Sequence, residues 1–150
     1  MKQYQIPQPL QRTQKVDRIV QNIGIDNIKF ILYQLLQALA YCHRHGIMHR
    51  NLKPDNILLS PPNSDVPLLK LSDFSLSRIA TMPHFPYTPE DPKERERSGR
   101  EARRLWYRAP EMLFRKKLYS FEVDIWAVGC LMAEITMGGE PLFSGESEIE

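Results

Sequence analysis

The centre of the sequence reads His49-Arg50-Asn51-Leu52-Lys53-Pro54-Asp55-Asn56. It carries a lysine ammonium, which acts as a point charge, and two neutral amides. The amide of Asn51 can hydrogen-bond a hydroxyl group, but it cannot take up that group's proton near neutral pH. The segments on either side of this stretch indicate how the fold presents these polar side chains.

A long amphipathic helix is predicted directly before this stretch. Asp26 can cap its start, because a carboxylate there accepts a hydrogen bond from a backbone amide, and Gly46 ends it. Its apolar residues recur at three- and four-residue steps; they are Ile28, Ile31, Leu32, Leu35, Leu36 and Leu39. About twenty residues at about 1.5 Å each make a rod of roughly 30 Å, which is enough to cross a small domain.

Two short apolar runs follow the central stretch, at 57–59 and 69–71, and turn-forming residues at 61–65 separate them. This pattern predicts a small β-hairpin. Such a hairpin places Asn56 and Asp73 close together at one end, although they are far apart in the sequence. That proximity is what a shared metal site needs.

A second helix is predicted at 123–135, where the residues are apolar almost all round except for Asp124 and Glu134. A helix without a polar face belongs in the middle of a core. The acidic residues Glu122 and Asp124 in its first turn suit the positive end of the helix dipole.

Three further motifs follow in order: Asp73-Phe74-Ser75, Leu105-Trp106-Tyr107-Arg108-Ala109-Pro110-Glu111 and Val123-Asp124-Ile125-Trp126-Ala127-Val128-Gly129-Cys130. With the central stretch, they resemble the motifs of protein kinases, which carry His-Arg-Asp, four residues and Asn, then Asp-Phe-Gly and Ala-Pro-Glu. The Trp-Tyr-Arg-Ala-Pro-Glu form and the stretches 123–130 and 143–149 are similar to cyclin-dependent kinases. The resemblance covers the chain from about Val16 to Glu150.

The resemblance implies a mainly α fold, the large C-terminal lobe of a protein kinase, with one or two short β-hairpins. It divides the chain into a disordered or extended leader at 1–14 and a partial kinase domain at 15–150 that is truncated at its C-terminal end. The activation segment at 73–111 is expected to be mobile, because its prolines and the mixed charges at 93–97 cannot bury enough apolar surface. The N-terminal lobe, with its Gly-rich phosphate loop, is expected to be absent.

The resemblance also assigns roles in phosphoryl transfer, and it implies ATP and Mg²⁺ as cofactors. Asp73 would bind the magnesium ion that bridges the nucleotide phosphates, and Asn56 would bind the second ion through its amide oxygen. Lys53 would neutralise the transferring phosphate as a point charge. Absence of the N-terminal lobe is expected to weaken nucleotide binding.

Three positions depart from the kinase pattern. Asn51 stands at the position of the catalytic base, and loss of a general base costs about 10² to 10⁴ in rate, or roughly 3 to 5 kcal/mol of barrier. Ser75 replaces a glycine and forfeits its easy access to positive φ, which is expected to stiffen the turn. Arg104 replaces a threonine that bonds the catalytic Asp and Lys, so the usual link between the two loops is expected to be lost.

Regulatory and structural roles follow from the same resemblance. Arg50 would grip a phosphorylated residue of the activation segment bidentately, and Ser98 is the best phosphorylation candidate, with a plain solvated loop as the alternative. Asp124 is expected to anchor the backbone of His49 and Arg50, with a helix-cap role as the alternative. Glu111 would pair with an arginine that lies past residue 150.

Composition argues against several other classes of protein. The net charge of +2 is too small to indicate a nucleic-acid or membrane partner, because non-specific polyanion binding needs a concentrated basic surface. The first ten residues lack the apolar core of a signal peptide, and no run of eighteen apolar residues occurs. We therefore expect a location in the nucleus or the cytoplasm. Cys42 and Cys130 lie in apolar helical patterns and indicate free thiols.

Two hypotheses from different classes follow. In the first, the chain represents a cyclin-dependent-kinase-like Ser/Thr kinase of the cell cycle, with phosphotransfer to protein substrates absent or strongly impaired. In the second, it is a pseudokinase or truncated lobe that acts as a non-catalytic scaffold for protein partners. A cyclin partner is implied only for a longer product, since the usual cyclin-binding helix lies in the N-terminal lobe. A third alternative, a nucleic-acid-binding module at 93–104, is disfavoured by its interleaved Glu residues.

Overall fold

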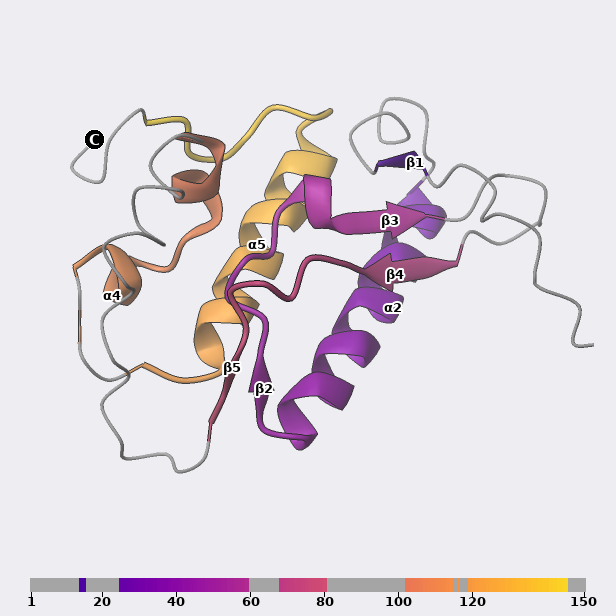
Figure 1. The fold of residues 1–150 in the computed structure, drawn as a ribbon. Coiled ribbons are helices and arrows are strands. Elements are labelled where there is room, and N and C mark those ends of the chain that lie inside the picture. Colours follow the sequence, from indigo (N-terminus) through magenta and orange to yellow (C-terminus); the bar gives the residue numbers. More distant parts are fainter. Residues whose placement is uncertain are drawn as a thin grey trace, which may run out of the picture.

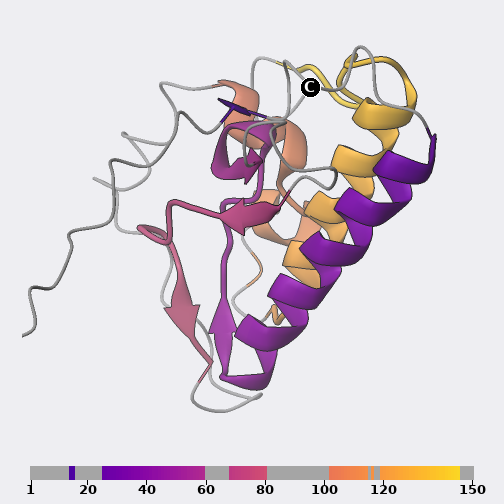
Figure 2. The same cartoon turned by 90° about the vertical axis from the view of Figure 1, so that its right-hand side faces the viewer.

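The computed structural model describes residues 14–15, 25–59, 68–80, 102–114, 116 and 119–145. Its helices are α2 (Ile25–Arg44), α4 (Pro110–Leu113) and α5 (Glu122–Thr136), with 3-10 turns η2 (Pro54–Asn56) and η3 (Ala102–Tyr107). Its strands are β1 (Gln14–Lys15), β2 (Ile47–Met48), β3 (Ile57–Leu59), β4 (Leu69–Leu71) and β5 (Arg78–Ile79). The long helices α2 and α5 contact each other, and the short strands lie beside them (Figures 1 and 2). This is the mainly α architecture that the sequence predicts.

Helix α2 is the long helix predicted before the central stretch, and it buries one stripe of side chains. Ile31, Leu35 and Leu39 recur every four residues and are 2%, 1% and 1% exposed. Leu36 belongs to the same apolar pattern but is exposed, because it lies about 100° around the helix from Leu35. Asp26 was expected to cap the helix, but it lies inside the first turn and its carboxylate faces Lys29 at 3.4 Å.

Gly46 ends the helical segment as predicted. Its φ of 72° lies in the left-handed region that favours glycine. Its amide donates to the carbonyl of His43 at 2.9 Å, and its carbonyl accepts from the amide of Ala80 at 2.6 Å. The chain therefore reverses at Gly46 and enters β2, which leads into the central stretch.

The predicted β-hairpin is confirmed as β3 and β4, which pair antiparallel with Ile57 opposite Leu71 and Leu59 opposite Leu69. Strand β1 adds to its other edge, giving the order β1-β3-β4. Gln14, placed at the end of the leader, is thus part of a strand, and residues 1–13 lie outside the described part of the chain. Strands β2 and β5 form a second antiparallel pair between segments that flank the central stretch and the Asp73 motif.

Helix α5 is less buried than its apolar sequence predicts. One side, which includes Val123, Ala127 and Leu131, packs into the core at 3%, 4% and 0% exposed. Ile125 and Met132, on the other side, are about half exposed, at 49% and 50%. A helix apolar all round suits a position with neighbours on every side, and among the described elements α2 and η3 are its main contacts.

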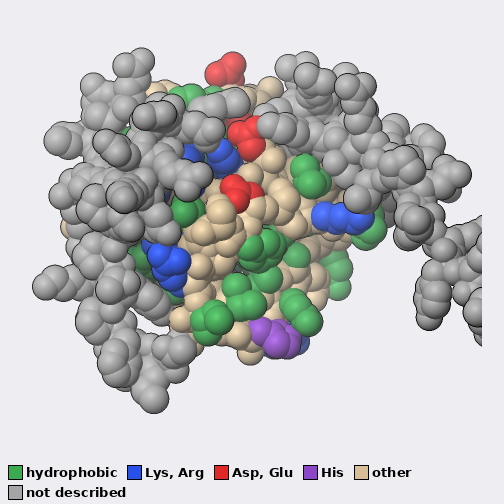
Figure 3. Space-filling model, in the orientation of Figure 1, with side chains coloured by type: hydrophobic (Ala, Val, Ile, Leu, Met, Phe, Trp, Pro, Cys, Tyr) green, Lys and Arg blue, Asp and Glu red, His purple; other side chains and the backbone are tan. Residues whose placement is uncertain are grey.

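Two surface properties bear on possible partners. Among the described residues, no helix combines the length and the apolar character that a membrane span requires. On the face drawn in Figure 3, the basic side chains of the described residues are scattered rather than gathered in one patch.

Candidate active site

The central stretch is anchored to helix α5 through Asp124, which is 1% exposed. Its Oδ2 accepts from the backbone amide of His49, and its Oδ1 accepts from that of Arg50, both at 2.8 Å. His43 Nε2 lies 2.9 Å from Oδ2 as well. No side chain caps α5 at Phe121, so the carboxylate serves the loop, as the kinase resemblance implies, and the cap alternative is not supported.

These hydrogen bonds hold a strained backbone. Arg50 has a φ of 65°, a region that non-glycine residues adopt at a cost of about 1 to 3 kcal/mol. Its guanidinium donates to the carbonyl of Leu76 at 3.2 Å and lies 5.6 Å from the ring centre of Tyr119. Ser98 lies outside the described residues, so the predicted phosphate-binding role of Arg50 stays a prediction.

His49 joins the loop to the segment that follows β4. Its side chain is fully buried, and its Nε2 lies 3.0 Å from the carbonyl oxygen of Ser72. Because a carbonyl only accepts, Nε2 carries the proton, and Nδ1 accepts from the amide of Asn51 at 3.3 Å. Burial lowers the pKa of His49, against a smaller raising effect from the Ser72 carbonyl. The ring is therefore a neutral structural link.

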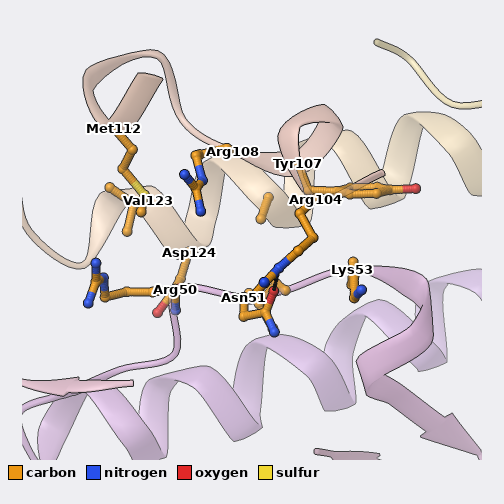
Figure 4. A pocket seen from close by; sticks show the side chains of 11 residues that line it. Arg50, Asn51, Lys53, Arg104, Tyr107, Arg108, Met112, Val123 and Asp124 are labelled. Atoms are coloured by element: carbon orange, nitrogen blue, oxygen red, sulfur yellow. Dashed lines mark hydrogen bonds between the residues drawn. The ribbon is translucent and has the colours of Figure 1, made fainter. Parts of the chain in front are cut away.

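Asn51 bridges two segments that are far apart in the sequence. Its Nδ2 donates to Oδ2 of Asp73 at 2.8 Å. Its Oδ1 accepts from Nε of Arg104 at 3.3 Å (Figure 4). The orientation of the amide is set by its partners, because a flipped amide would face oxygen with oxygen and nitrogen with nitrogen. The threonine that usually links the two loops is replaced by Arg104, and Asn51 and Arg104 form a different link between them.

Asp73 is surrounded by hydrogen-bond donors. Its Oδ1 accepts from the hydroxyl of Ser75 at 2.5 Å and, at a longer 3.4 Å, from the Ser75 amide. Its Oδ2 accepts from Asn51 and, at 3.4 Å, from Nδ2 of Asn56. The Ser75 hydroxyl is the main cause that lowers the pKa of Asp73, and the positive charge of Arg104 lowers it further.

Ser75 acts differently from the expectation. Among the described non-glycine residues, positive φ occurs at Arg50 and at Asp73, where φ is 59°, and not at Ser75. Loss of glycine at position 75 therefore places no strain on this turn. The sequence does hold a signal for one of these contacts, because an aspartate side chain commonly accepts from the backbone amide two residues on, as Asp73 does from Ser75.

Asn56 lies beside Asp73, as the predicted hairpin requires. Its Nδ2 donates to the carbonyl of Asn51 at 2.7 Å, which leaves its amide oxygen as the possible metal ligand. Its own carbonyl accepts from the amide and hydroxyl of Ser72 at 2.9 and 3.1 Å. These bonds fix the end of the hairpin against the central stretch.

The residue types at this point suit Mg²⁺, which prefers oxygen ligands from carboxylates and amides. The hydrogen bonds that Asp73 accepts are less suited to a bound Mg²⁺ ion. Both carboxylate oxygens of Asp73 already accept from protein donors, and the strongest of these, at 2.5 and 2.8 Å, come from Ser75 and Asn51. A metal ion would have to displace or share these donors. Among the described residues, no group of three or more His, Cys, Asp or Glu side chains is arranged to hold a metal ion.

A cleft opens on the other side of Asn51, between the central stretch and the segment 104–112 (Figure 4). Four of its lining side chains are basic: Arg50, Lys53, Arg104 and Arg108. Lys53 is 7% exposed, and its Nζ lies 3.9 Å from Oδ2 of Asp55. A positively charged lining of this kind suits an anionic or phosphorylated ligand.

Two contacts that tie η3 to the core were not foreseen. The Tyr107 hydroxyl donates to the buried carboxylate of Glu134 on α5. Trp106 Nε1 donates to the carbonyl of Gly145 at 2.7 Å. Glu111 lies partly buried in α4, and no ion pair to it occurs among the described residues. The only sequence signal for the contact between Tyr107 and Glu134 was that Glu134 is a charged residue inside an otherwise apolar helix.

Comparison with known proteins agrees with these motifs. The protein kinase domain family matches residues 6–150. Cell division control protein 2 homolog 3 of Trypanosoma brucei brucei is 45% identical over 122 residues, which are 81% of this chain and 34% of that protein. Cyclin-dependent kinase B2-1 of Arabidopsis thaliana is 41% identical over 129 residues, which are 86% of this chain and 36% of that protein.

Cyclin-dependent kinase B2-1 of Oryza sativa subsp. japonica is 40% identical over 131 residues, 87% of this chain and 36% of that protein. The chain thus spans about a third of the length of these relatives. The family match takes in the central stretch, the Asp73 motif and helix α5. The chain therefore belongs to the protein kinase family, and within that family it is similar to the cyclin-dependent kinases.

Proposed function

We propose that this chain is the large lobe of a cyclin-dependent-kinase-like Ser/Thr kinase in which phosphoryl transfer is strongly impaired. The observation that carries the proposal is the amide of Asn51, which stands at the position of the catalytic base. Its nitrogen donates to Asp73 and its oxygen accepts from Arg104. An amide engaged in this way can orient a substrate hydroxyl only weakly, and it cannot accept its proton.

The other residues of the site support the ancestry of a phosphotransferase. The Asp124 carboxylate holds the backbone at His49 and Arg50 in the conformation that presents position 51. Lys53 is buried at the edge of the cleft, where its ammonium suits a phosphoryl group. ATP, which the kinase family uses with Mg²⁺, would supply the group to be transferred.

Partners and location belong to the same proposal. Two of the relatives are cyclin-dependent kinases by name, so a cyclin and protein substrates in the cell cycle are the partners we propose for a longer product. The tyrosine and arginine of the Trp-Tyr-Arg motif, Tyr107 and Arg108, line the cleft. By resemblance, Arg108 favours substrates in which proline follows the phosphorylated residue. A nuclear or cytoplasmic location agrees with such substrates.

A second candidate function is a non-catalytic scaffold for protein partners. The exposed apolar side of α5 favours it, since Ile125 and Met132 are half exposed and Trp126 stacks on Phe143 with ring centres 6.0 Å apart. Exposed apolar patches often mark protein interaction sites. This candidate predicts that no change at position 51 produces phosphotransfer.

The test is phosphotransfer from ATP to a Ser-Pro peptide by the native-length protein and by its Asn51→Asp variant. We expect the variant to exceed the wild type by about 10² to 10⁴, the usual contribution of a general base. Asn27→Asp makes the same chemical change at an exposed position of α2 and should leave the rate unchanged. Equal and measurable rates for the wild type and Asn51→Asp would contradict the impaired-kinase proposal, and no transfer by either would favour the scaffold.

The intact mass of the native polypeptide in its source cells complements this assay. A mass well above 17.5 kDa would show that the native polypeptide has further residues, as a complete kinase needs for binding nucleotide. A mass near that value would favour the scaffold, and the variant would then be expected to show no transfer.

A further inference from the structure

The contacts of Asp73 share a feature that the kinase resemblance does not explain. The two shortest hydrogen bonds to its carboxylate come from Ser75 Oγ at 2.5 Å and Asn51 Nδ2 at 2.8 Å. Both donors belong to residues that depart from the kinase pattern. The two departures are far apart in the sequence, yet they act on the two oxygens of one carboxylate.

The residues that kinases carry at these positions could not make these bonds. A glycine at position 75 has no hydroxyl, and an aspartate at position 51 has no N–H to donate. A carboxylate in place of the Asn51 amide, which lies 2.8 Å from Asp73, would add a second negative charge, which is unfavourable unless a cation lies between the two. The family residues would therefore bring two carboxylates together, a repulsion that a cation relieves, whereas the residues of this chain place a neutral donor beside Asp73.

Arg104 extends the same arrangement. Its Nε donates to the Asn51 oxygen at 3.3 Å, so a chain of hydrogen bonds runs from Arg104 through Asn51 to Asp73. Asn51 is 6% exposed, and both polar ends of its side chain are satisfied within the protein. The positive charge of Arg104 balances the negative charge of Asp73 across one neutral amide.

We propose that Asn51, Ser75 and Arg104 form a hydrogen-bonded lock on Asp73 that takes the place of the metal ion, so that these loops are held together without Mg²⁺. The proposal deepens the proposed function in one respect, because it takes Asp73 as the metal ligand of the family. It makes two predictions: the folded chain gains no stability from Mg²⁺, and restoring the family residues makes its stability depend on Mg²⁺.

The test measures the melting temperature of the native-length protein in EDTA and in millimolar MgCl₂, for the wild type and for the double variant Asn51→Asp/Arg104→Thr. The second substitution is needed because Arg104 would otherwise neutralise the new carboxylate. We expect the wild-type melting temperature to be the same in both solutions. The double variant should melt roughly 5 °C lower than the wild type in EDTA and regain most of that loss in MgCl₂, since an ion that binds only the folded state raises its melting temperature.

Two further variants serve as controls for this test. Asn27→Asp adds the same charge at an exposed site and should show no response to Mg²⁺. If the double variant fails to fold in both solutions, Ser75→Ala decides, because it removes only the hydroxyl donor on the exposed turn. A rise of the Ser75→Ala melting temperature in MgCl₂ supports the lock, and no rise contradicts it.

A wild-type melting temperature that rises in MgCl₂ would overturn the proposal, as would a double variant whose melting temperature does not respond. These outcomes are independent of the phosphotransfer assay. A wild type that transfers phosphate efficiently but melts identically with and without Mg²⁺ would refute the proposed function and leave the lock in place. A wild type that transfers no phosphate but is stabilised by Mg²⁺ would refute the lock and leave the proposed loss of activity in place.

Discussion

At the scale of single residues, this site depends on side chains that each serve two partners. Asn51 contacts Asp73 and Arg104, and Asp124 contacts the amides of His49 and Arg50. Each is nearly fully buried, so neither can exchange a lost partner for water. Hydrogen bonds to a buried charge contribute more than neutral ones, and removal of the charged group leaves its donors unsatisfied.

Asp124 gives the clearest prediction at this scale. An asparagine at position 124 has the same shape as the aspartate, but only its oxygen can accept a hydrogen bond. Its NH₂ group would then face one of the two backbone N–H groups. We expect Asp124→Asn to lower the free energy of unfolding by about 2 to 3 kcal/mol, measured by urea denaturation. Hydrogen exchange at the amides of His49 and Arg50 should also be faster.

The matched control for that change is Asp26→Asn, which removes a carboxylate from the exposed first turn of α2. Its cost should stay below about 1 kcal/mol. Similar losses for both variants, or unchanged exchange at residues 49 and 50, would show that Asp124 does not anchor the loop.

At the scale of elements, α5 is the support for the site, because it carries Asp124 near its start and contacts both α2 and η3. Its two sides differ in surroundings although both are apolar. Leu131 is fully buried and belongs to the core cluster, whereas its neighbour Met132 is 50% exposed. The contribution of each of these two side chains to the free energy of unfolding therefore depends on its burial rather than on its hydrophobicity.

This difference can be measured with two truncations on one helix. Leu131→Ala should lower the free energy of unfolding by about 2 to 5 kcal/mol, since it removes buried methyl groups and leaves a cavity. Met132→Ala should cost less than about 1 kcal/mol. Both are read from chemical denaturation at one pH, and a larger loss from Met132→Ala would mean that the exposed side of α5 is covered in solution.

At the scale of the whole molecule, stability should depend on the protonation of the core thiol Cys130. Burial raises the pKa of this thiol from 9.0 to about 11. Between these values the unfolded chain loses the proton while the folded chain keeps it, so the unfolded state binds fewer protons. Stability therefore falls as pH rises through this window and is unaffected below it.

The predicted loss reaches roughly 3 kcal/mol above the folded-state pKa, from a shift of about two units at about 1.4 kcal/mol each. The measurement is the free energy of unfolding across pH 8 to 11, roughly the window set by the two pKa values. Cys130→Ala removes the titrating group and should flatten the decline relative to the wild type. Parallel curves for the two proteins would contradict the assignment, because other groups would then cause the decline.

Local sequence patterns predicted the two long helices and the β3–β4 hairpin, because the causes of these elements are local. The apolar spacing around Ile31 and Leu35 and the glycine at position 46 specify a helix and its end. The alternating run at 69–71 specifies a strand, and its pairing with 57–59 follows from the short connection. The same reasoning failed for Leu36 and for the far side of α5, where exposure depends on which neighbours surround a helix.

The sequence alone determined the family, the order of the motifs, the two long helices and the hairpin that brings Asn56 to Asp73. Only the tertiary structure decided how Asn51, Ser75 and Arg104 are used. Their contacts join segments that are 22 to 53 residues apart, or form within a turn whose geometry is set by its surroundings. A residue pattern specifies chemistry at each position, but a hydrogen bond needs two groups at the right distance and angle, and that placement arises only when the whole chain packs.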